Sequence, residues 1–392
     1  MSEIRVTNVI GENGNSPVNF TKGINMSGIC TAPAFVPSQG QLSHRNLVIN
    51  GAMMVAQRGT SSTTSGYGTV DRFILGHTGT DEAPTQSQVD VASGTTPYSL
   101  GFRKAFRVTN GNQTSGAGAA DAIQYTYKFE AQDIANSGWN YTSSSSYVTL
   151  SFWCKSSVAQ EFHGFLLTND GSAQLYSFST GSLSADTWTK VTKTIPGNSN
   201  LTFNSDNGEG INMRISQYQG TNYTGSITEN QWAAFNTSIR NPDMTSTWYT
   251  TNDATFELTG MQLEVGPVAT PFEHRSRGDE LARCQRYFYK WVSSQAYSNM
   301  CLAYAGSSTQ VETVFNLPVV MRASPSFAFS GQFRFVGYSP QNSTNLSNLV
   351  VHRSHTLTPY LRGTVSGSAS GLVGELGDSG SNNATASFSA EL

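Results

Sequence analysis

The sequence predicts an all-β protein built from β-sandwiches, and three observations support this class. Apolar and polar residues alternate over many short stretches, as they do in strands that bury one face. Clusters of glycine, asparagine and serine separate these stretches and are typical of the polar turns of a sandwich. The chain has 392 residues, of which 11% are aromatic and 12% charged, so it can build hydrophobic cores and is not predicted to be disordered.

Residues 1–45 are predicted to form an extended N-terminal segment for attachment or oligomerisation. The stretch IRVTNVIGENGNSPVNFTKGINMSG alternates briefly at Ile4 and Val6 before glycines and a Ser-Pro pair interrupt it. It has too few apolar residues for a core of its own, so we expect it to lean on the next domain, on sister chains or on a docking partner. Its last part, PAFVPSQGQLSHR, is predicted to be a linker, because prolines disfavour helices and central strands.

Residues 46–274 are predicted to form one sandwich domain of many short strands. The clearest strand signal is YVTLSFWCKSS, in which an apolar face alternates with a mostly polar one. The apolar phase contains Val148, Leu150, Phe152 and Cys154, and the other phase contains Thr149, Ser151, Trp153 and Lys155. In TFELTGMQLEVG the apolar phase shifts at Gly260, which indicates a β-bulge. We expect this closing strand to lie beside an opening strand at Leu47–Ile49, so that the domain is closed by its own two ends.

A short helical linker is predicted in residues 275–291, in the stretch RSRGDELARCQRYFYKW. Ser276 can cap its start, and Asp279 and Glu280 would then lie in the first turn, near the positive end of the helix dipole. Residues 292–392 return to alternating patterns such as TQVETVFNLP and PSFAFSGQFRFVGY. They predict a smaller C-terminal β-sandwich, large enough to fold alone or as part of an oligomer.

The charge and the apolar pattern argue against several classes of function. The net charge is -3 and no basic stripe appears, so no nucleic-acid partner is expected. The sequence has no long apolar run and no basic-then-apolar leader, so neither membrane insertion nor export is expected. The cysteines form no CxxC pair, and reduced thiols fit assembly in a reducing cytoplasm. The four cysteines are Cys30, Cys154, Cys284 and Cys301.

Enzyme signatures such as GxSxG, HExxH and a phosphate-binding loop are absent from the sequence, so a protein without enzymatic activity is predicted. Two polar turns instead carry aromatic residues, in SGWNYTSSSSY and SQYQGTNYTG. A flat ring packs on the apolar face of a pyranose while amide side chains bond its hydroxyl groups. The candidate glycan-binding residues are therefore Trp139, Tyr141, Tyr218 and Tyr223. The alternative is that these rings cap the core or face a neighbouring subunit.

A structural calcium ion is a second candidate ligand. Calcium takes roughly six to eight oxygen ligands, partly from backbone carbonyl groups, and such oxygens gather where two end strands pair. Asn50, Glu264 and Glu273 are the candidate ligands at that place. No other cofactor is expected.

Five motifs in order carry a resemblance to a known family: NLVINGAMMVAQRG, GYGTVDRF, VTLSFWCKSS, TWTKVTKTIPG and FELTGMQLEVGPVATPFEHRSRGDELARCQRYF. They resemble a module of structural proteins of tailed bacteriophages, especially marine and cyanobacterial phages. That module is similar to the jelly-roll carbohydrate-binding modules of glycosidases. The resemblance covers about residues 46–290 and implies a jelly-roll sandwich in a virion protein, most often a tail fibre or a related surface appendage. The first 45 residues look like short attachment segments of phage appendages.

The resemblance implies a place and partners for the protein. We expect a receptor-binding appendage on the virion, assembled in the cytoplasm of the bacterial host, that attaches to host surface polysaccharide. Residues 1–45 would dock it to other virion proteins, tail or adaptor, or knit subunits into a homotrimer. One alternative is a head or collar decoration protein without a receptor role. Another is a capsule depolymerase, which would need a cleft with two converging carboxylates.

Overall fold

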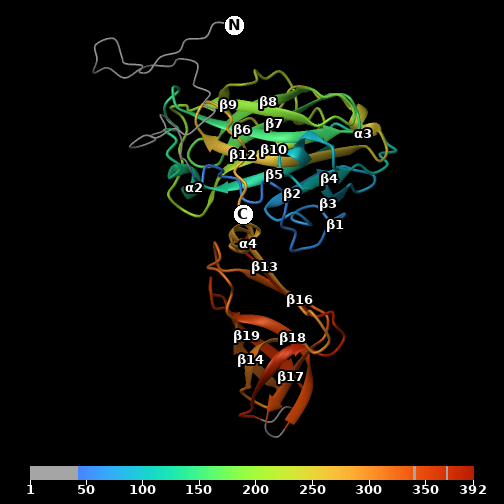
Figure 1. Ribbon diagram of the computed structural model, residues 1–392, viewed down its shortest axis with the longest axis vertical. Coiled ribbons are helices and arrows are strands. Elements are labelled where there is room, and N and C mark those ends of the chain that lie inside the picture. The colour runs from blue at the N-terminus through green and yellow to red at the C-terminus, as the bar shows by residue number, and fades with distance from the viewer. Residues whose placement is uncertain (1–42, 339–340, 368–369) are drawn as a thin grey trace, which may run out of the picture. The chain divides into compact units, whose positions relative to one another are not determined.

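The computed structural model describes residues 43–338, 341–367 and 370–392 (Figure 1). Antiparallel strands dominate, so the all-β class predicted from the sequence is confirmed. The described residues belong to one compact unit, whose two largest hydrophobic clusters form the core of the sandwich and the core of the C-terminal region. The predicted attachment segment, residues 1–45, lies outside the described residues except for its last three.

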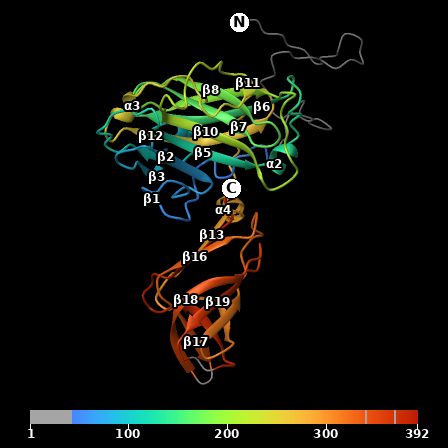
Figure 2. The ribbon, with the colours of Figure 1, turned by 180° about the vertical axis from the view of Figure 1, so that it is seen from behind.

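Two six-stranded antiparallel sheets make the sandwich (Figure 1, and from behind in Figure 2). The strand order in sheet A is β1 (Ser61–Ser62), β3 (Thr85–Asp90), β4 (Lys104–Thr109), β12 (Thr255–Val265), β6 (Tyr147–Ser156) and β9 (Thr189–Pro196). The strand order in sheet B is β11 (Trp232–Ala234), β8 (Gln174–Ser182), β7 (Glu161–Thr168), β10 (Glu209–Gln219), β5 (Ala122–Glu130) and β2 (Phe73–Thr78). This is the jelly-roll arrangement that the family resemblance implied.

The core of the sandwich is filled by the apolar phase of each strand. Phe256 of sheet A meets Phe162 of sheet B with ring centres 4.9 Å apart, and Phe106 of sheet A meets Tyr125 of sheet B at 4.6 Å. All four rings are buried. Burying a side chain of this size contributes about 1.5–3 kcal/mol, so the alternation seen in the sequence is what holds the two sheets together.

The opening segment lies beside the closing strand β12, as predicted. The backbone N–H of Leu47 donates to the carbonyl oxygen of Leu263 at 2.9 Å, and that of Met261 donates to Gly51 at 2.9 Å. The segment does not form a strand of its own, which corrects one detail of the prediction. The reason is a sharp turn at Asn50, which has a φ of 62° and lies between the two hydrogen-bonded residues Leu47 and Gly51, so no continuous ladder forms.

The predicted β-bulge is confirmed at Gly260. The register between β12 and β6 slips between Thr259 and Gln262, and Gly260 has a φ of +62°. A Cβ atom at this position would lie 2.7 Å from the Phe102 ring. Glycine is therefore required here both for its backbone conformation and for its lack of a side chain.

Four short helices interrupt the strands: α1 (Thr96–Ser99), α2 (Ala131–Ala135), α3 (Thr247–Thr250) and α4 (Arg277–Gln285). In α4, Ser276 accepts a hydrogen bond from the backbone N–H of Asp279 at 3.1 Å, which confirms the predicted cap. The helix is shorter than predicted, because strand β13 already begins at Phe288. Aromatic residues favour a strand there over a further helical turn. Within the described ranges, no helix has the length and apolar character needed to span a membrane.

The C-terminal region differs from the predicted sandwich. Six of its strands close into a barrel in the order β14 (Asn299–Ala305), β15 (Gln310–Val314), β19 (Tyr360–Val365), β18 (Gln341–Arg353), β17 (Phe333–Tyr338) and β20 (Val373–Asp378). The other three form a separate sheet in the order β13 (Phe288–Val292), β21 (Thr385–Ser389) and β16 (Ser326–Ser330). Strand alternation is the same in barrels and sandwiches, so the sequence pattern does not separate them. Closure depends on close backbone contacts: a Cβ at Gly374 would lie 2.0 Å from the carbonyl oxygen of Val336.

Candidate functional site

Two of the four predicted glycan-binding rings belong to the core. The Trp139 side chain is 3% exposed and lies 6.2 Å from Phe203, between ring centres. Tyr218 is 6% exposed and stacks on Tyr249 at 4.5 Å. Neither ring offers a free face to a ligand, so the alternative noted for these residues, that they cap the core, describes them correctly.

The other two predicted rings, Tyr141 and Tyr223, are half-buried and have different neighbours. Tyr141 packs edge-on against Phe203 at 4.9 Å, beside Trp139. Tyr223 lies under the guanidinium of Arg240, 4.7 Å from the ring centre. Each ring already has a partner on one side, and the four predicted residues do not form one aromatic platform.

Two of the predicted calcium ligands are used within the protein. The side-chain amide of Asn50 donates to the carbonyl oxygens of Val55 and Asp71 at 2.8 and 2.9 Å, and its oxygen accepts from the Val55 N–H at 2.9 Å. The carboxylate of Glu264 accepts from the N–H and the hydroxyl of Thr270 at 2.8 and 2.6 Å. Asn50 and Glu264 thus each hold a nearby loop, and their side chains do not converge on one site.

The third predicted ligand, Glu273, forms an ion pair with Arg275 at 3.1 Å. The guanidinium of Arg275 also donates to the carbonyl oxygens of Asn46 and Val48, and Glu280 lies 3.6 Å from it. Burial would raise the pKa of Glu273, but the hydrogen bond from the Asn46 N–H and the charge of Arg275 lower it. The guanidinium of Arg275 is thus the cation that the carboxylate of Glu273 binds.

The described residues contain no group of three or more histidine, cysteine, aspartate or glutamate side chains placed to hold a metal ion. The side chains of Asn50, Glu264 and Glu273 are thus all bonded within the protein, and the calcium site stays a prediction.

A cleft of about 400 Å³ lies on the outer face of sheet A. This face carries a hydrophobic cluster separate from the sandwich core, with Trp153, Trp188 and Phe272 partly buried in it. The side chains that define the cleft are Phe102, Ser151, Trp153, Lys190, Phe272 and His274. Its volume lies within the range of about 300–1,000 Å³ typical of ligand sites.

Strand pairing brings the central residues of the cleft together. Trp153 lies in the outward phase of β6, and its cross-strand partners are Thr259 of β12 and Lys190 of β9. Directly paired residues on one face of an antiparallel sheet have Cβ atoms about 4.5–5.5 Å apart. The indole ring and the lysine side chain are therefore neighbours on the same outer surface.

The wall of the cleft is a loop that follows β12 and is tied back to it. Thr270 is held by Glu264, and the N–H of Glu273 donates to the side-chain oxygen of Gln262 at 2.8 Å. Phe272 lies between these two anchored residues, and His274 directly follows the second. The bonds therefore place both side chains at the edge of the cleft.

The floor is aromatic. The Phe102 ring meets Phe272 edge-on at 4.9 Å and lies 5.1 Å from the His274 ring. The His274 Nε2 donates to the carbonyl oxygen of Leu100 at 2.9 Å, which fixes the imidazole orientation. These contacts make a firm apolar surface next to Trp153.

Three hydrogen-bond donors in the cleft are unused. Among the residues that the structure describes, no partner is found for the Ser151 hydroxyl, the Trp153 indole N–H or the Lys190 ammonium group. These donors are open to the cleft, and Lys190 is exposed, so all three are available to a polar ligand.

A row of charged side chains runs beside the cleft across three strands. Glu257 of β12 is 2% exposed and is bonded by Arg107 of β4 at 2.9 Å and by Lys155 of β6 at 3.0 Å. The Lys155 ammonium group lies 5.3 Å from the centre of the Trp188 ring. The buried carboxylate thus holds both cations on the outer face.

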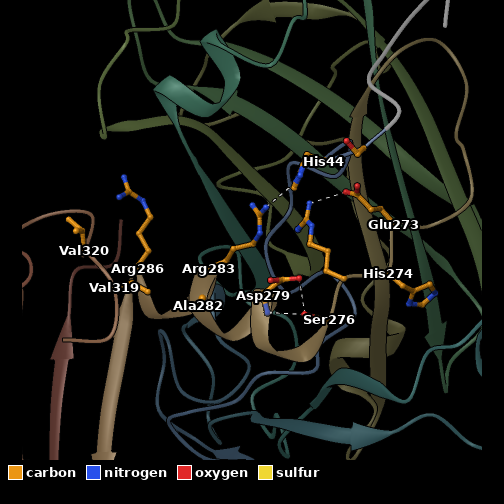
Figure 3. A pocket seen from close by; sticks show the side chains of 12 residues that line it. His44, Glu273, His274, Ser276, Asp279, Ala282, Arg283, Arg286, Val319 and Val320 are labelled. Atoms are coloured by element: carbon orange, nitrogen blue, oxygen red, sulfur yellow. Dashed lines mark hydrogen bonds and ion pairs between the residues drawn. The ribbon is translucent and has the colours of Figure 1, made fainter. Parts of the chain in front are cut away.

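A larger hollow of about 640 Å³ lies beside α4, and Figure 3 shows the side chains that line it. Its main charged groups are already paired. Arg275 is paired with Glu273, and Arg286 holds Glu130 through two hydrogen bonds of 2.9 and 2.8 Å. We therefore interpret this hollow as part of the contacts that hold α4 in place, and we take the cleft on sheet A as the candidate ligand site.

The strand pattern, and not the aromatic turns, contains the sequence signal for the cleft. Trp153 occupies the polar phase of its strand, and a large aromatic residue on an outward face is itself a binding-site signal. Trp188 and Lys190 likewise share one phase of TWTKVTKTIPG. Phe272 and His274 had no such signal, because a loop and not a repeating pattern places them.

Comparisons with known proteins bear on the fold only. No protein-family model matches the chain, and no curated protein is significantly similar to it. The enzymatically active domain of tailspike protein 4 from bacteriophage CBA120 aligns at 14% identity and a TM-score of 0.31, over 56% of this chain and 21% of that chain. This chain therefore spans about a fifth of the length of that tailspike structure.

Two carbohydrate-binding domains are also similar. The N-terminal cellulose-binding domain of Cellulomonas fimi β-1,4-glucanase C aligns at 12% identity and a TM-score of 0.26, over 55% of this chain and 99% of that domain. A family 11 carbohydrate-binding module from Clostridium thermocellum aligns at 12% identity and a TM-score of 0.23, over 55% and 98%. Such values assign no ligand. Fold and cleft together define a jelly-roll protein with an aromatic cleft on one sheet.

Proposed function

We propose that the protein binds carbohydrate through the cleft on sheet A and does not cleave it. One observation carries this proposal: the Trp153 ring, whose own N–H is unused, lies beside two further unused hydrogen-bond donors, Ser151 and Lys190, in a cleft of about 400 Å³. Sugars are recognised by the same combination, an aromatic ring against the C–H face of a pyranose and donors for its hydroxyl oxygens.

Each side chain has a role in this proposal. Trp153 provides the stacking surface, while Phe272 and Phe102 line the apolar side of the cleft. The Ser151 hydroxyl and the Lys190 ammonium group bond the sugar oxygens. The fixed imidazole of His274 leaves one ring nitrogen available as a further partner.

We propose further that the protein is a structural component of a tailed bacteriophage particle, a tail fibre or receptor-binding appendage that attaches to host surface polysaccharide. The support is the order of five phage-like motifs over residues 46–290 and the jelly-roll fold they implied. Residues 1–45 would join the protein to other virion proteins and to two sister chains. A trimer brings three weak sugar sites together, and effective concentration then raises the overall affinity.

The test is binding of the full chain to an array of bacterial surface polysaccharides. Trp153→Ala should lower the affinity for any bound glycan at least about tenfold, because a stacked ring contributes on the order of 1.4 kcal/mol. Tyr338→Ala is the matched control, since Tyr338 is 53% exposed on the barrel and far from the cleft in the strand order. Equal binding by wild type and Trp153→Ala, or no glycan bound by the wild type, would refute the proposal.

A second assay separates binding from cleavage. Each bound polysaccharide is incubated with the protein, and new reducing ends are measured. No increase is expected for a binding protein, whereas a depolymerase would shorten the polymer. A decoration protein without a receptor role would neither adsorb to host cells nor block infection by the phage.

A further inference from the structure

The outer face of sheet A carries accessible positive charge in a protein whose net charge is -3. The cations on this face are Arg107, Lys155 and Lys190. The carboxylates in the outward phase of β12 are Glu257 and Glu264, each 2% exposed and each bonded to protein groups. The charge that solvent and ligands meet is therefore mainly that of the cations.

Two tryptophans and two lysines alternate on this face. Trp153 and Lys155 are two residues apart in β6, and Trp188, which directly precedes β9, is two residues from Lys190 in that strand. Trp153 is the cross-strand partner of Lys190, and the Lys155 ammonium group lies 5.3 Å from the Trp188 ring. We call these four residues the Trp–Lys square. Each indole ring in it has an ammonium group as its neighbour across the strand pair.

The two lysines of the square differ in one respect. Lys155 is paired with Glu257 at 3.0 Å, so its charge is already balanced. Lys190 is exposed, and no acidic partner for it is found in the described part of the chain. A ligand that packs on Trp153 covers the surface next to this unbalanced charge. A neutral ligand would supply hydrogen-bond acceptors to Lys190 but no counter-charge, whereas an anionic ligand would supply both.

We propose that the cleft selects an anionic polysaccharide, with an acidic group of the sugar on Lys190 while the pyranose ring packs on Trp153. This inference rests on the proposed carbohydrate binding and adds the class of sugar. Arg107 and Lys155 share the single carboxylate of Glu257, so these three side chains keep one net positive charge that strengthens the field at the cleft without contacting the same acidic group of the sugar. Carboxylated and sulfated sugars share this chemistry, and the test separates them.

The test uses the full chain and pairs of polysaccharides that differ in charge alone. Polygalacturonate is compared with its methyl ester, and dextran sulfate with dextran, next to the glycans that the array identifies. Binding should be stronger to the acidic member of a pair and should weaken as salt is raised, because an exposed charge pair is screened. Lys190→Met should lower the affinity for acidic glycans about tenfold and that for neutral glycans by clearly less, because a neutral glycan loses one hydrogen bond and an acidic one also loses a charge pair.

Lys193→Met is the matched control, since Lys193 lies on the same strand in the opposite phase, as the partner of Leu150. It should bind like the wild type. If neutral glycans bind as well as acidic ones and Trp153→Ala still abolishes binding, the charge inference is wrong and the proposed function stands. If no polysaccharide binds, both are wrong. If every sulfated polymer and DNA bind alike, and Trp153→Ala has no effect, the face is a non-selective cation exchanger and the inference is also overturned.

Discussion

The guanidinium of Arg72 lies 3.4 Å from the centre of the Tyr287 ring. Tyr287 lies between α4 and β13, so this contact joins the sandwich to the segment that leads into the C-terminal region. Arg72 is 1% exposed, donates to the carbonyl oxygen of Lys128 at 2.7 Å and pairs with Glu391. Burial would lower the pKa of Arg72, but the charge of Glu391 raises it well above its usual value. A cation fully removed from water is thus held by one carboxylate, one carbonyl and two rings, the second being Tyr127 at 5.4 Å.

Arg72→Met should destabilise the protein by about 3 kcal/mol, because removing one partner of a buried ion pair leaves Glu391 with the longer contact to Arg58, at 3.2 Å, as its counter-charge. Urea unfolding followed by tryptophan fluorescence measures the effect. Arg103→Met is the control: Arg103 also stacks on a ring, Tyr98 at 3.9 Å, but it is exposed. Its loss should cost no more than about 0.5 kcal/mol. Equal losses in the two variants would contradict the role given to Arg72.

The buried carboxyl group of Asp71 should make stability fall with rising pH. Burial raises the pKa of Asp71 from 3.8 to about 6, although Gln57 donates to it at 3.0 Å and Arg58 lies 3.7 Å away. A pKa raised in the folded state means that the folded protein binds more protons, so the stabilisation is complete below pH 3.8 and is lost as pH rises through about 6. The difference corresponds to about 3 kcal/mol.

Asp71→Asn removes this titration and keeps an oxygen that can accept from Gln57. The free energy of unfolding of the wild type minus that of the variant should therefore fall between about pH 4 and pH 6, as measured by urea unfolding at each pH. A difference that stays constant over this range would show that Asp71 does not titrate there.

Gly260→Ala should affect both stability and the cleft. The new Cβ would lie 2.7 Å from Phe102, at a φ of +62° that disfavours alanine. We expect a loss of about 1–3 kcal/mol and weaker glycan binding, because the Phe102 ring must move within the cleft. Gly278→Ala in α4 is the control, since its nearest atom is 3.9 Å away in Ser276 and alanine favours a helix. Unchanged binding by Gly260→Ala would show that the cleft tolerates movement of Phe102.

The local features of the fold were predictable from the sequence. The bulge at Gly260 appears as a shift of apolar phase within one strand, and the cap of α4 appears as Ser276 three residues before Asp279. Both depend on neighbouring residues only. The closure of the C-terminal barrel depends on pairing between β14 and β20, which lie far apart in the chain, and alternation alone carries no information about it.

The candidate site was predictable only in part. The polar stretch around Trp139 predicts an exposed ring. In the structure Phe203, from a loop distant in the sequence, packs against this ring. Trp153 showed its outward position in the strand pattern, whereas the place of Phe272 depends on the hydrogen bonds of Glu264 with Thr270. Sidedness within one strand can be derived from alternation, but contacts made by loops cannot.

Calcium should neither stabilise the protein nor be needed by it, because the three predicted ligands are already bonded within the protein, Glu273 among them to the guanidinium of Arg275. The carbonyl groups of Asn46 and Val48 and the carboxylates of Glu273 and Glu280 all face this one side chain. Thermal unfolding should therefore give the same midpoint with excess calcium and with a chelator. Arg275→Met should lower the stability by about 3 kcal/mol, since two largely buried carboxylates then lack a counter-charge. A midpoint that drops when the chelator is added to the wild type would show that a metal ion, and not Arg275, holds the two ends of the sandwich together.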